Sequence, residues 1–144
     1  MDMIDSFEGK YAFLSNFYEH PIQYQGIVYP TNEHFFQAMK SLKEDERKMI
    51  AAAPTPGKAK RLGRAITLRT DWETVKYDIM LMGLRLKFCD KELREKLRKT
   101  GDEELVEGTT WHDNIWGNCS CERCRNIPGQ NWLGKLLMQV RNEI

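Results

Sequence analysis

The sequence lacks the features of a membrane-spanning or exported protein. No run approaches the roughly 18 consecutive apolar residues that a transmembrane helix needs. Residues 1–5 are acidic and have neither the basic nor the apolar region of a signal peptide. We therefore expect a cytoplasmic protein with no membrane partner. In that compartment its four cysteines are predicted to be thiols or metal ligands rather than disulfides.

An excess of charge of either sign is also missing. The chain has 22 basic and 21 acidic side chains, which leave a formal net charge of +1. A nucleic-acid binder that relies on a broad basic surface usually carries a larger excess. The near-zero charge therefore leans towards a small-molecule partner, although a local anion site stays open.

Several common catalytic motifs are absent as well. There is no Gly-rich phosphate loop, no HExxH and no GxSxG, so nothing supports a serine or metalloprotease mechanism. The chain also has no linker, repeat or low-complexity segment. Its 144 residues are predicted to form one domain over residues 1–144, large enough for a hydrophobic core.

Turn and cap residues predict a mainly α-helical α+β domain with a small N-terminal β-hairpin. Residues 7–30 are aromatic and β-rich, and Gln25-Gly26 is a plausible two-residue turn between strands at 22–24 and 27–29. Pro, Gly and N-cap residues delimit helices at about 33–42, 44–52, 56–63, 71–88, 91–100 and 131–142. Residues 104–107 are either helical or extended, and residues 108–129 are predicted to form a long loop.

Two of these helices carry more specific expectations. Thr70 and Glu73 have the spacing of a capping box at the start of the longest helix. The buried seam of that helix is predicted to consist of Val75, Ile79, Met82 and Leu86. The last helix is predicted to bury Leu133, Leu136, Leu137 and Val140.

The helix that follows Pro30 has two opposed stripes. Thr31 or Asn32 is its predicted N-cap. One stripe is apolar and consists of Phe35, Ala38, Met39 and Leu42. The other is polar and consists of Glu33, Gln37, Lys40 and Glu44. A polar stripe is usually a solvated face, but a carboxylate, an amide and an amine in line also suit a reaction site.

Three further segments each have a structural and a functional interpretation. Residues 13–18 interleave aromatics with a hydroxyl and an amide, and they either fill the core or stack on a planar base. A loop at 111–118 holds a carboxylate between two tryptophans. A basic set is either a solvated helix face or a phosphate site, and it consists of Lys58, Lys60, Arg61, Arg64 and Arg69.

The cysteines at 119–124 raise the question of a metal. Zn²⁺ takes Cys and His ligands in tetrahedral sites, and Cys121-x-x-Cys124 is a usable half-site. A second such pair is absent, so His112, Cys89 or Cys119 would have to complete the site. A loop of reduced thiols is the alternative that the sequence favours.

Taken in order, these segments resemble the NADAR family, also called YbiA-like N-glycosidases. The resemblance runs from residue 7 to residue 141. It consists of FLSNF at 13–17, YPTxEHxFQAxK at 29–40, AxxLGR at 59–64, LRxDW at 68–72, MxxGLRxKF at 80–88, DxxWG at 113–117 and GxNxLGxxLM at 129–138. Seven motifs in the same order make the resemblance specific.

The resemblance implies a YbiA-like fold and an enzyme that hydrolyses a bond between a ribose C1′ and a nitrogen. Similar proteins act on phosphoribosyl-aminopyrimidine intermediates of riboflavin synthesis, and others remove ADP-ribose from modified guanine. The implied partner is thus a small phosphorylated ribosyl or ADP-ribosyl substrate, or an ADP-ribosylated nucleic acid. No cofactor is implied, and the oligomeric state is left open.

The resemblance also implies roles for individual residues. Glu33 matches the family's acidic position, with Asp113 as a second carboxylate and Lys40 as a nearby amine that shifts the pKa of Glu33 or acts on the opened sugar. Asn16 and Phe17 would frame the base. The full implied substrate-binding set is Asn16, Phe17, Phe36, Gln37, Arg64, Arg69, Trp72, Trp116, Gly117 and Asn131.

The sequence departs from the simplest family pattern at residues 118–127. A short glycine-rich linker is replaced there by a segment with the zinc candidates Cys119, Cys121 and Cys124. Because the implied hydrolysis requires no metal, we expect this loop to be structural and not a catalytic metal site. Two other functions stay open: a non-catalytic sensor of ADP-ribose or an NAD-type nucleotide, and a zinc-stabilised interaction domain.

Overall fold

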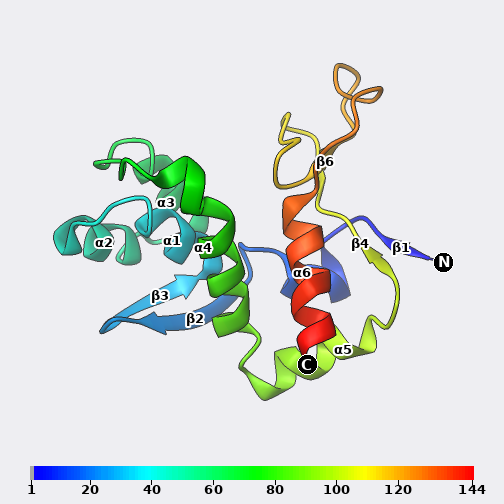
Figure 1. Cartoon of the computed structure of the whole chain (residues 1–144), viewed down its shortest axis with the longest axis horizontal. Helices are drawn as coiled ribbons and strands as arrows, with labels where there is room; N and C mark the ends of the chain where they lie inside the picture. Colours follow the sequence, from blue (N-terminus) through cyan, green and yellow to red (C-terminus); the bar gives the residue numbers. More distant parts are fainter. Residues whose placement is uncertain (1) are drawn as a thin grey trace. The chain divides into compact units, whose positions relative to one another are not determined.

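The hairpin predicted around Gln25-Gly26 is present in the computed structural model, which describes residues 2–144 (Figure 1). Strand β2 (Glu19–Tyr24) pairs antiparallel with β3 (Ile27–Thr31). Gln25 and Gly26 have φ angles of 49° and 82°, and a type I′ turn requires positive φ at both positions. The turn therefore sets the register that carries the chain into the first helix.

The chain divides into two compact units. Residues 16–89 form one, and residues 2–15 together with 90–144 form the other. The first contains the hairpin and helices α1 (Asn32–Ala38), α2 (Glu44–Ala51), α3 (Pro56–Leu62) and α4 (Trp72–Lys87).

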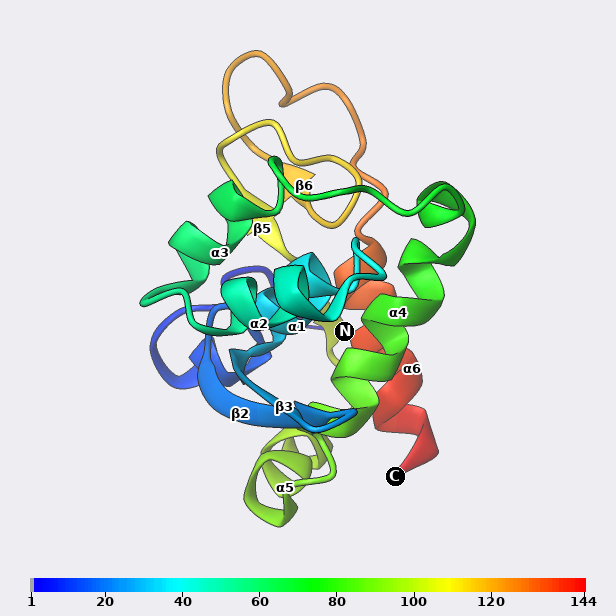
Figure 2. The same ribbon diagram turned by 90° about the vertical axis from the view of Figure 1, so that its left-hand side faces the viewer.

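Helix α1 is the centre of the first unit. It contacts β2, β3, α2, α3 and α4, and all seven of its residues are buried (Figures 1 and 2). Thr31 is the N-cap, as predicted, because its hydroxyl accepts a hydrogen bond from the backbone N–H of His34 at 3.2 Å. The predicted end of this helix near residue 42 is wrong. The helix ends at Ala38, so Leu42 lies beyond it and is 67% exposed.

Helix α4 begins without the predicted capping box. Asp71 is the N-cap but makes no side-chain cap bond, because its carboxylate instead forms an ion pair with Arg69. Glu73 forms an ion pair with Lys76, one turn later. The predicted seam is right for Ile79 alone. Val75 and Leu86 are half-buried and Met82 is exposed, and the other buried residues of the helix are Trp72, Met80, Gly83, Leu84 and Lys87.

The second unit is held by two helices and two small parallel sheets. Its helices are α5 (Lys91–Lys99) and α6 (Trp132–Glu143), preceded by a 3₁₀ helix η1 (Gly9–Leu14). Strand β1 (Met3–Ile4) pairs with β4 (Glu104–Leu105), and β5 (Gly108–Thr109) pairs with β6 (Asn118–Cys119).

Most expectations for the second unit are confirmed. Asp90 caps α5 by accepting from the N–H of Leu93 at 3.0 Å, and α6 buries the four predicted apolar residues. Residues 9–14 are helical although their aromatic content favoured strand, and residues 104–105 take the extended alternative. No helix within residues 2–144 is both long and apolar enough to cross a membrane.

The close approach of α4 to α1 depends on Gly83. A Cβ atom there would lie 2.1 Å from Asn32 Oδ1 and 2.9 Å from Phe35 Cδ2. We expect Gly83→Ala to lower the free energy of unfolding by about 1–3 kcal/mol, because the two helices must separate. Gly57→Ala in α3 is the matched control, since its Cβ would meet nothing closer than 4.0 Å. Urea unfolding of both variants measures the difference, and equal stability would contradict this account of the packing.

Candidate functional site

Glu33 is a buried carboxylate in the first turn of α1. Glu33 is only 8% exposed, and its Oε2 accepts a hydrogen bond from Gln37 Nε2 at 3.0 Å. Its backbone N–H donates to the carbonyl of Asn16 at 3.0 Å. Buried carboxylates are uncommon in proteins and concentrate at functional sites. Of the two alternatives for the polar stripe, burial excludes the solvated face for Glu33 and Gln37.

Gln37 occupies its position because Gly63 leaves room for it. A Cβ at Gly63 would lie 2.0 Å from Gln37 Oε1. That oxygen is buried and has no hydrogen-bond partner within residues 2–144. Gln37 thus orients Glu33 with its nitrogen and keeps an acceptor oxygen beside it.

Lys40 follows α1 and is half-buried near the same carboxylate. Burial lowers the pKa of the Lys40 ammonium, and the positive charges of Arg64 and Lys60 lower it further. The negative charge of Glu33 acts in the opposite direction and raises this pKa. These effects show that the four charged groups share one electrostatic environment.

Aromatic side chains form one wall beside Lys40. The rings of Phe36 and Trp72 pack with centroids 5.0 Å apart, and Lys40 Nζ lies 5.9 Å from the Trp72 ring centroid. Trp72 is only 6% exposed, so neighbouring side chains already cover most of its surface. Phe17, at 46% exposure, offers far more free surface for stacking on a base.

Arg64 and Arg69, the two arginines of the implied substrate-binding set, differ in their partners. Arg69 makes a bidentate ion pair with Asp71, at 2.6 and 3.1 Å, and this pair raises the pKa of Arg69. Its backbone N–H donates to the carbonyl of Lys40 at 2.7 Å, which ties the segment before α4 to the end of α1. Arg64 is exposed and acts on Lys40 through its charge.

Asn16 forms a buried amide cluster with Asn32, which is not among the predicted site residues. Its Oδ1 accepts from Asn32 Nδ2 at 2.8 Å, and both amides contact the Met80 sulfur, at 3.5 and 3.6 Å. The sequence predicts Asn32 only as a cap, and its place next to Glu33 in the first turn of α1 is the feature that points to a role in the site. The cluster fixes the start of α1 and hence the position of Glu33.

His34 is a second buried polar residue of α1. Its Nε2 donates to the carbonyl of Ala53 at 3.0 Å, so its Nδ1 accepts from the hydroxyl of Thr31, 2.8 Å away. Burial lowers the pKa of this imidazole. Both nitrogens are thus used to anchor α1, which gives His34 a structural role.

The remaining predicted residues lie in the unit formed by residues 2–15 and 90–144. Asp113 Oδ1 accepts from the backbone N–H groups of Ile115 and Trp116, at 3.2 and 2.9 Å, and so closes a turn. Asn131 is held by Leu105 and Glu107, at 2.9 and 3.0 Å. The predicted catalytic role of Asp113 and the predicted substrate-binding roles of Asn131, Trp116 and Gly117 stay predictions.

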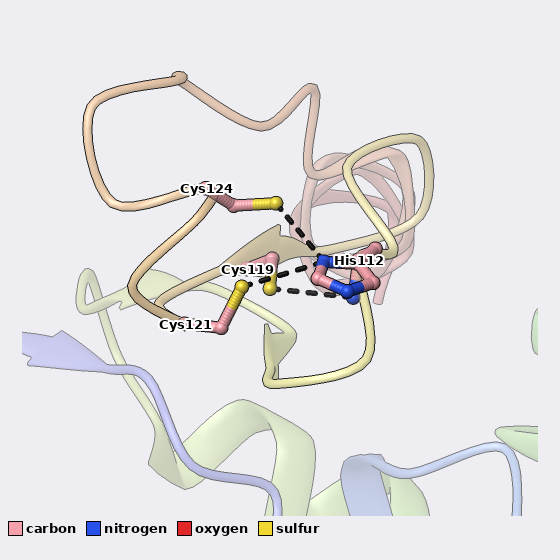
Figure 3. Close-up of side chains that lie close together, drawn as sticks. All are labelled: His112, Cys119, Cys121 and Cys124. Carbon is pink, nitrogen blue, oxygen red and sulfur yellow. Dashed lines mark hydrogen bonds between the residues drawn. The ribbon is translucent and has the colours of Figure 1, made fainter.

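The three candidate cysteines lie together with His112 in one cluster (Figure 3). Burial alone would raise the pKa of the Cys119 thiol. Hydrogen bonds from the N–H groups of Cys121 and His112 and from the two other thiols oppose this effect and lower the pKa to about 6. These are the side chains of the second unit that could hold a metal. Cys89, which the sequence left open as a ligand, is exposed and outside the group.

Comparisons with known proteins agree with the fold and the motifs. The NADAR domain profile matches residues 5–144. An N-glycosidase of Nostoc punctiforme is 43% identical over 140 residues, which cover 93% of this chain and 86% of that protein. The chloroplastic riboflavin biosynthesis protein PYRR of Zea mays is 35% identical over 152 residues, which cover 93% of this chain and 23% of that protein. The NMR structure of the Escherichia coli protein YbiA matches with a TM-score of 0.81 and 39% identity, over 99% of this chain and 84% of that chain. The structural match confirms the predicted YbiA-like α+β fold.

The electrostatics of Lys40 generate a test that needs no substrate. Because burial lowers its pKa, its amine should react with an acylating reagent with a midpoint below the usual lysine value of about 10.4. Glu33→Gln removes the charge that raises this pKa, so the midpoint should fall further. Peptide mapping by mass spectrometry over a pH series gives both midpoints. A midpoint that does not change in the variant would show that the two groups are not coupled.

Proposed function

This chain belongs to the NADAR domain family, and from that premise we propose that it hydrolyses the bond between a ribose C1′ and a nitrogen. Its relative in Nostoc punctiforme is an N-glycosidase, and the family profile covers both compact units. The observation that carries the proposal is the buried Glu33 carboxylate that Gln37 holds, whose charge raises the pKa of the half-buried Lys40 amine.

Glu33 is proposed to act at the reacting carbon. Cleavage of a C1′–N bond builds positive charge on the sugar, and a carboxylate next to that carbon stabilises the charge or activates water. Burial strengthens this interaction, because water screens charges less in a protected site. The Gln37 amide holds one oxygen of the carboxylate at 3.0 Å, so Glu33 needs little reorganisation during the reaction.

The positive side chains around Lys40 support a phosphorylated substrate. Lys40, Lys60 and Arg64 lie close enough for each of the latter two to lower the pKa of the first. A substrate phosphate would offset the mutual repulsion of these positive charges. Arg69 already has its carboxylate partner in Asp71, so we assign phosphate binding to Arg64 rather than to Arg69.

The substrate class that the relatives favour is a phosphoribosyl-aminopyrimidine of riboflavin synthesis, since the maize relative is a riboflavin biosynthesis protein. Guanine-linked ADP-ribose offers the same ribose C1′–N bond and also carries phosphate. It is the second substrate that a test must include. Asp113 stays the predicted second carboxylate, with one oxygen occupied in its own turn.

Glu33→Gln keeps the shape of the side chain and removes its charge. We expect this variant to fold and to lose turnover by about 100-fold or more, because it cannot stabilise the developing cation. Mass spectrometry of both substrates, offered to wild type and variant, measures release of the aminopyrimidine with ribose phosphate and of guanine with ADP-ribose.

Glu44→Gln is the control for the Glu33 experiment, because Glu44 is an exposed glutamate of α2 and its turnover should equal that of wild type. Full turnover by a folded Glu33→Gln variant would remove Glu33 from the reaction. If wild type bound both substrates and cleaved neither, the protein would instead be a nucleotide sensor.

Arg64→Ala tests the phosphate assignment. Loss of a charged hydrogen bond to phosphate should raise KM about 10-fold or more for the phosphorylated substrate. The same variant should leave KM for the dephosphorylated substrate unchanged. Arg61→Ala, at another exposed arginine of the same segment, is the control. An equal rise in KM for both substrates would place the phosphate elsewhere.

A further inference from the structure

The cluster of His112, Cys119, Cys121 and Cys124 lies outside the machinery assigned to hydrolysis. We propose that these four side chains bind one Zn²⁺ ion in a tetrahedral site that stabilises the loop between β5 and α6. This inference is independent of the proposed N-glycosidase activity.

The geometry of the four ligand atoms fits such an ion. His112 and the three cysteines each present one ligand atom, and all four atoms lie within 4.8 Å of one another. His112 Nδ1 is 3.3 Å from Cys121 Sγ and 3.3 Å from Cys124 Sγ (Figure 3). Zn–S bonds near 2.3 Å and Zn–N bonds near 2.0 Å place neighbouring ligands about 3.5–3.8 Å apart at tetrahedral angles. A small inward or outward movement of these side chains therefore completes the site.

The backbone holds the ligands in this arrangement by local hydrogen bonds. Pairing of β5 with β6 sets Thr109 opposite Cys119, and Asn114 Oδ1 accepts from the Cys119 N–H at 2.9 Å. A turn brings Cys124 back towards Cys121, since the Cys124 N–H donates to the Cys121 carbonyl at 3.0 Å. The three cysteine ligands thus come from a strand and the turn that follows it.

His112 joins the cysteines through an uncommon backbone conformation. Its φ angle is 68°, in the left-handed region that costs a non-glycine residue about 1–3 kcal/mol. In that conformation its backbone N–H donates to Cys119 Sγ at 3.3 Å while its ring faces the other two sulfurs. A metal bond from Nδ1 offsets the cost of this conformation.

The donor set indicates a structural metal rather than a catalytic one. Four protein ligands fill a tetrahedral Zn²⁺ site, whereas catalytic zinc keeps a position for water or substrate. The surrounding loop has little other means of support: between residues 108 and 131 the regular structure is two strands of two residues each. Cys119 and Cys124 are buried, so the ion would replace a hydrophobic core at this end of the unit.

The metal content of the purified wild-type protein is the first measurement. Elemental analysis by mass spectrometry should find one zinc per chain, and a thiol-specific mercurial should release it. Replacement by Co²⁺ should give the visible bands of tetrahedral thiolate coordination. Iron in place of zinc, or a folded metal-free protein that takes up no added Zn²⁺, overturns the proposal.

Variants of the cysteines localise the ion. Cys124→Ser should lose the zinc equivalent, and Cys89→Ser, at the exposed cysteine outside the cluster, should retain it. His112→Cys should retain zinc, because four thiolates also form a closed site. Loss of zinc from Cys89→Ser with retention in Cys124→Ser would place the ion elsewhere.

A chelator experiment on wild type covers the case in which Cys124→Ser does not fold. Removal of zinc should raise amide hydrogen exchange in residues 110–130, because the loop loses its cross-link, and should leave residues 16–89 unchanged. Added Zn²⁺ should restore the protection. Exchange that is unaltered by chelation in residues 110–130 would show that no structural metal is present.

Discussion

Complete burial of helix α1 is the constraint on which the unit of residues 16–89 depends. Every residue of this helix is buried, including Asn32, Glu33, His34 and Gln37. A buried polar group without a partner destabilises the fold by about 1–3 kcal/mol. Neighbouring segments supply partners for Asn32 and His34, from the Asn16 amide, the Thr31 hydroxyl and the Ala53 carbonyl, and Gln37 donates to Glu33 within the helix. Polar contacts as well as apolar ones thus decide where the hairpin and the surrounding helices pack.

The same burial gives the site its chemical character. A carboxylate at the surface would be surrounded by water and screened from a nearby charge. Glu33 is instead held by Gln37 and lies near the desolvated amine of Lys40. Such an arrangement opposes folding, since both charges lose solvent. Its presence in a small protein is easier to explain by function than by stability.

The unit formed by residues 2–15 and 90–144 has a different basis. Its helix α6 buries an apolar face, but the loop before α6 contains few apolar residues and little regular structure. Thiols and an imidazole gather there instead of a hydrophobic cluster. The proposed metal cross-link would supply order without requiring many buried side chains, so a loop of this composition would keep a defined shape through a few strong bonds.

The sequence by itself determined the family, the helical α+β fold and the local features that depend on neighbouring residues. The Gln25-Gly26 turn, the caps at Thr31 and Asp90, and the buried face of α6 all follow from residues close together in the chain. Tertiary structure decided what depends on distant partners. Periodicity showed two faces of α1 but not that Glu33 and Gln37 of the polar one are buried, with Gln37 against Gly63 at the end of α3. Cap spacing at Thr70 did not reveal that Arg69 engages Asp71. His112, Cys89 and Cys119 were the candidates to complete the half-site of Cys121 and Cys124. Only the tertiary structure brings His112 and Cys119 to these two cysteines and leaves Cys89 outside the group.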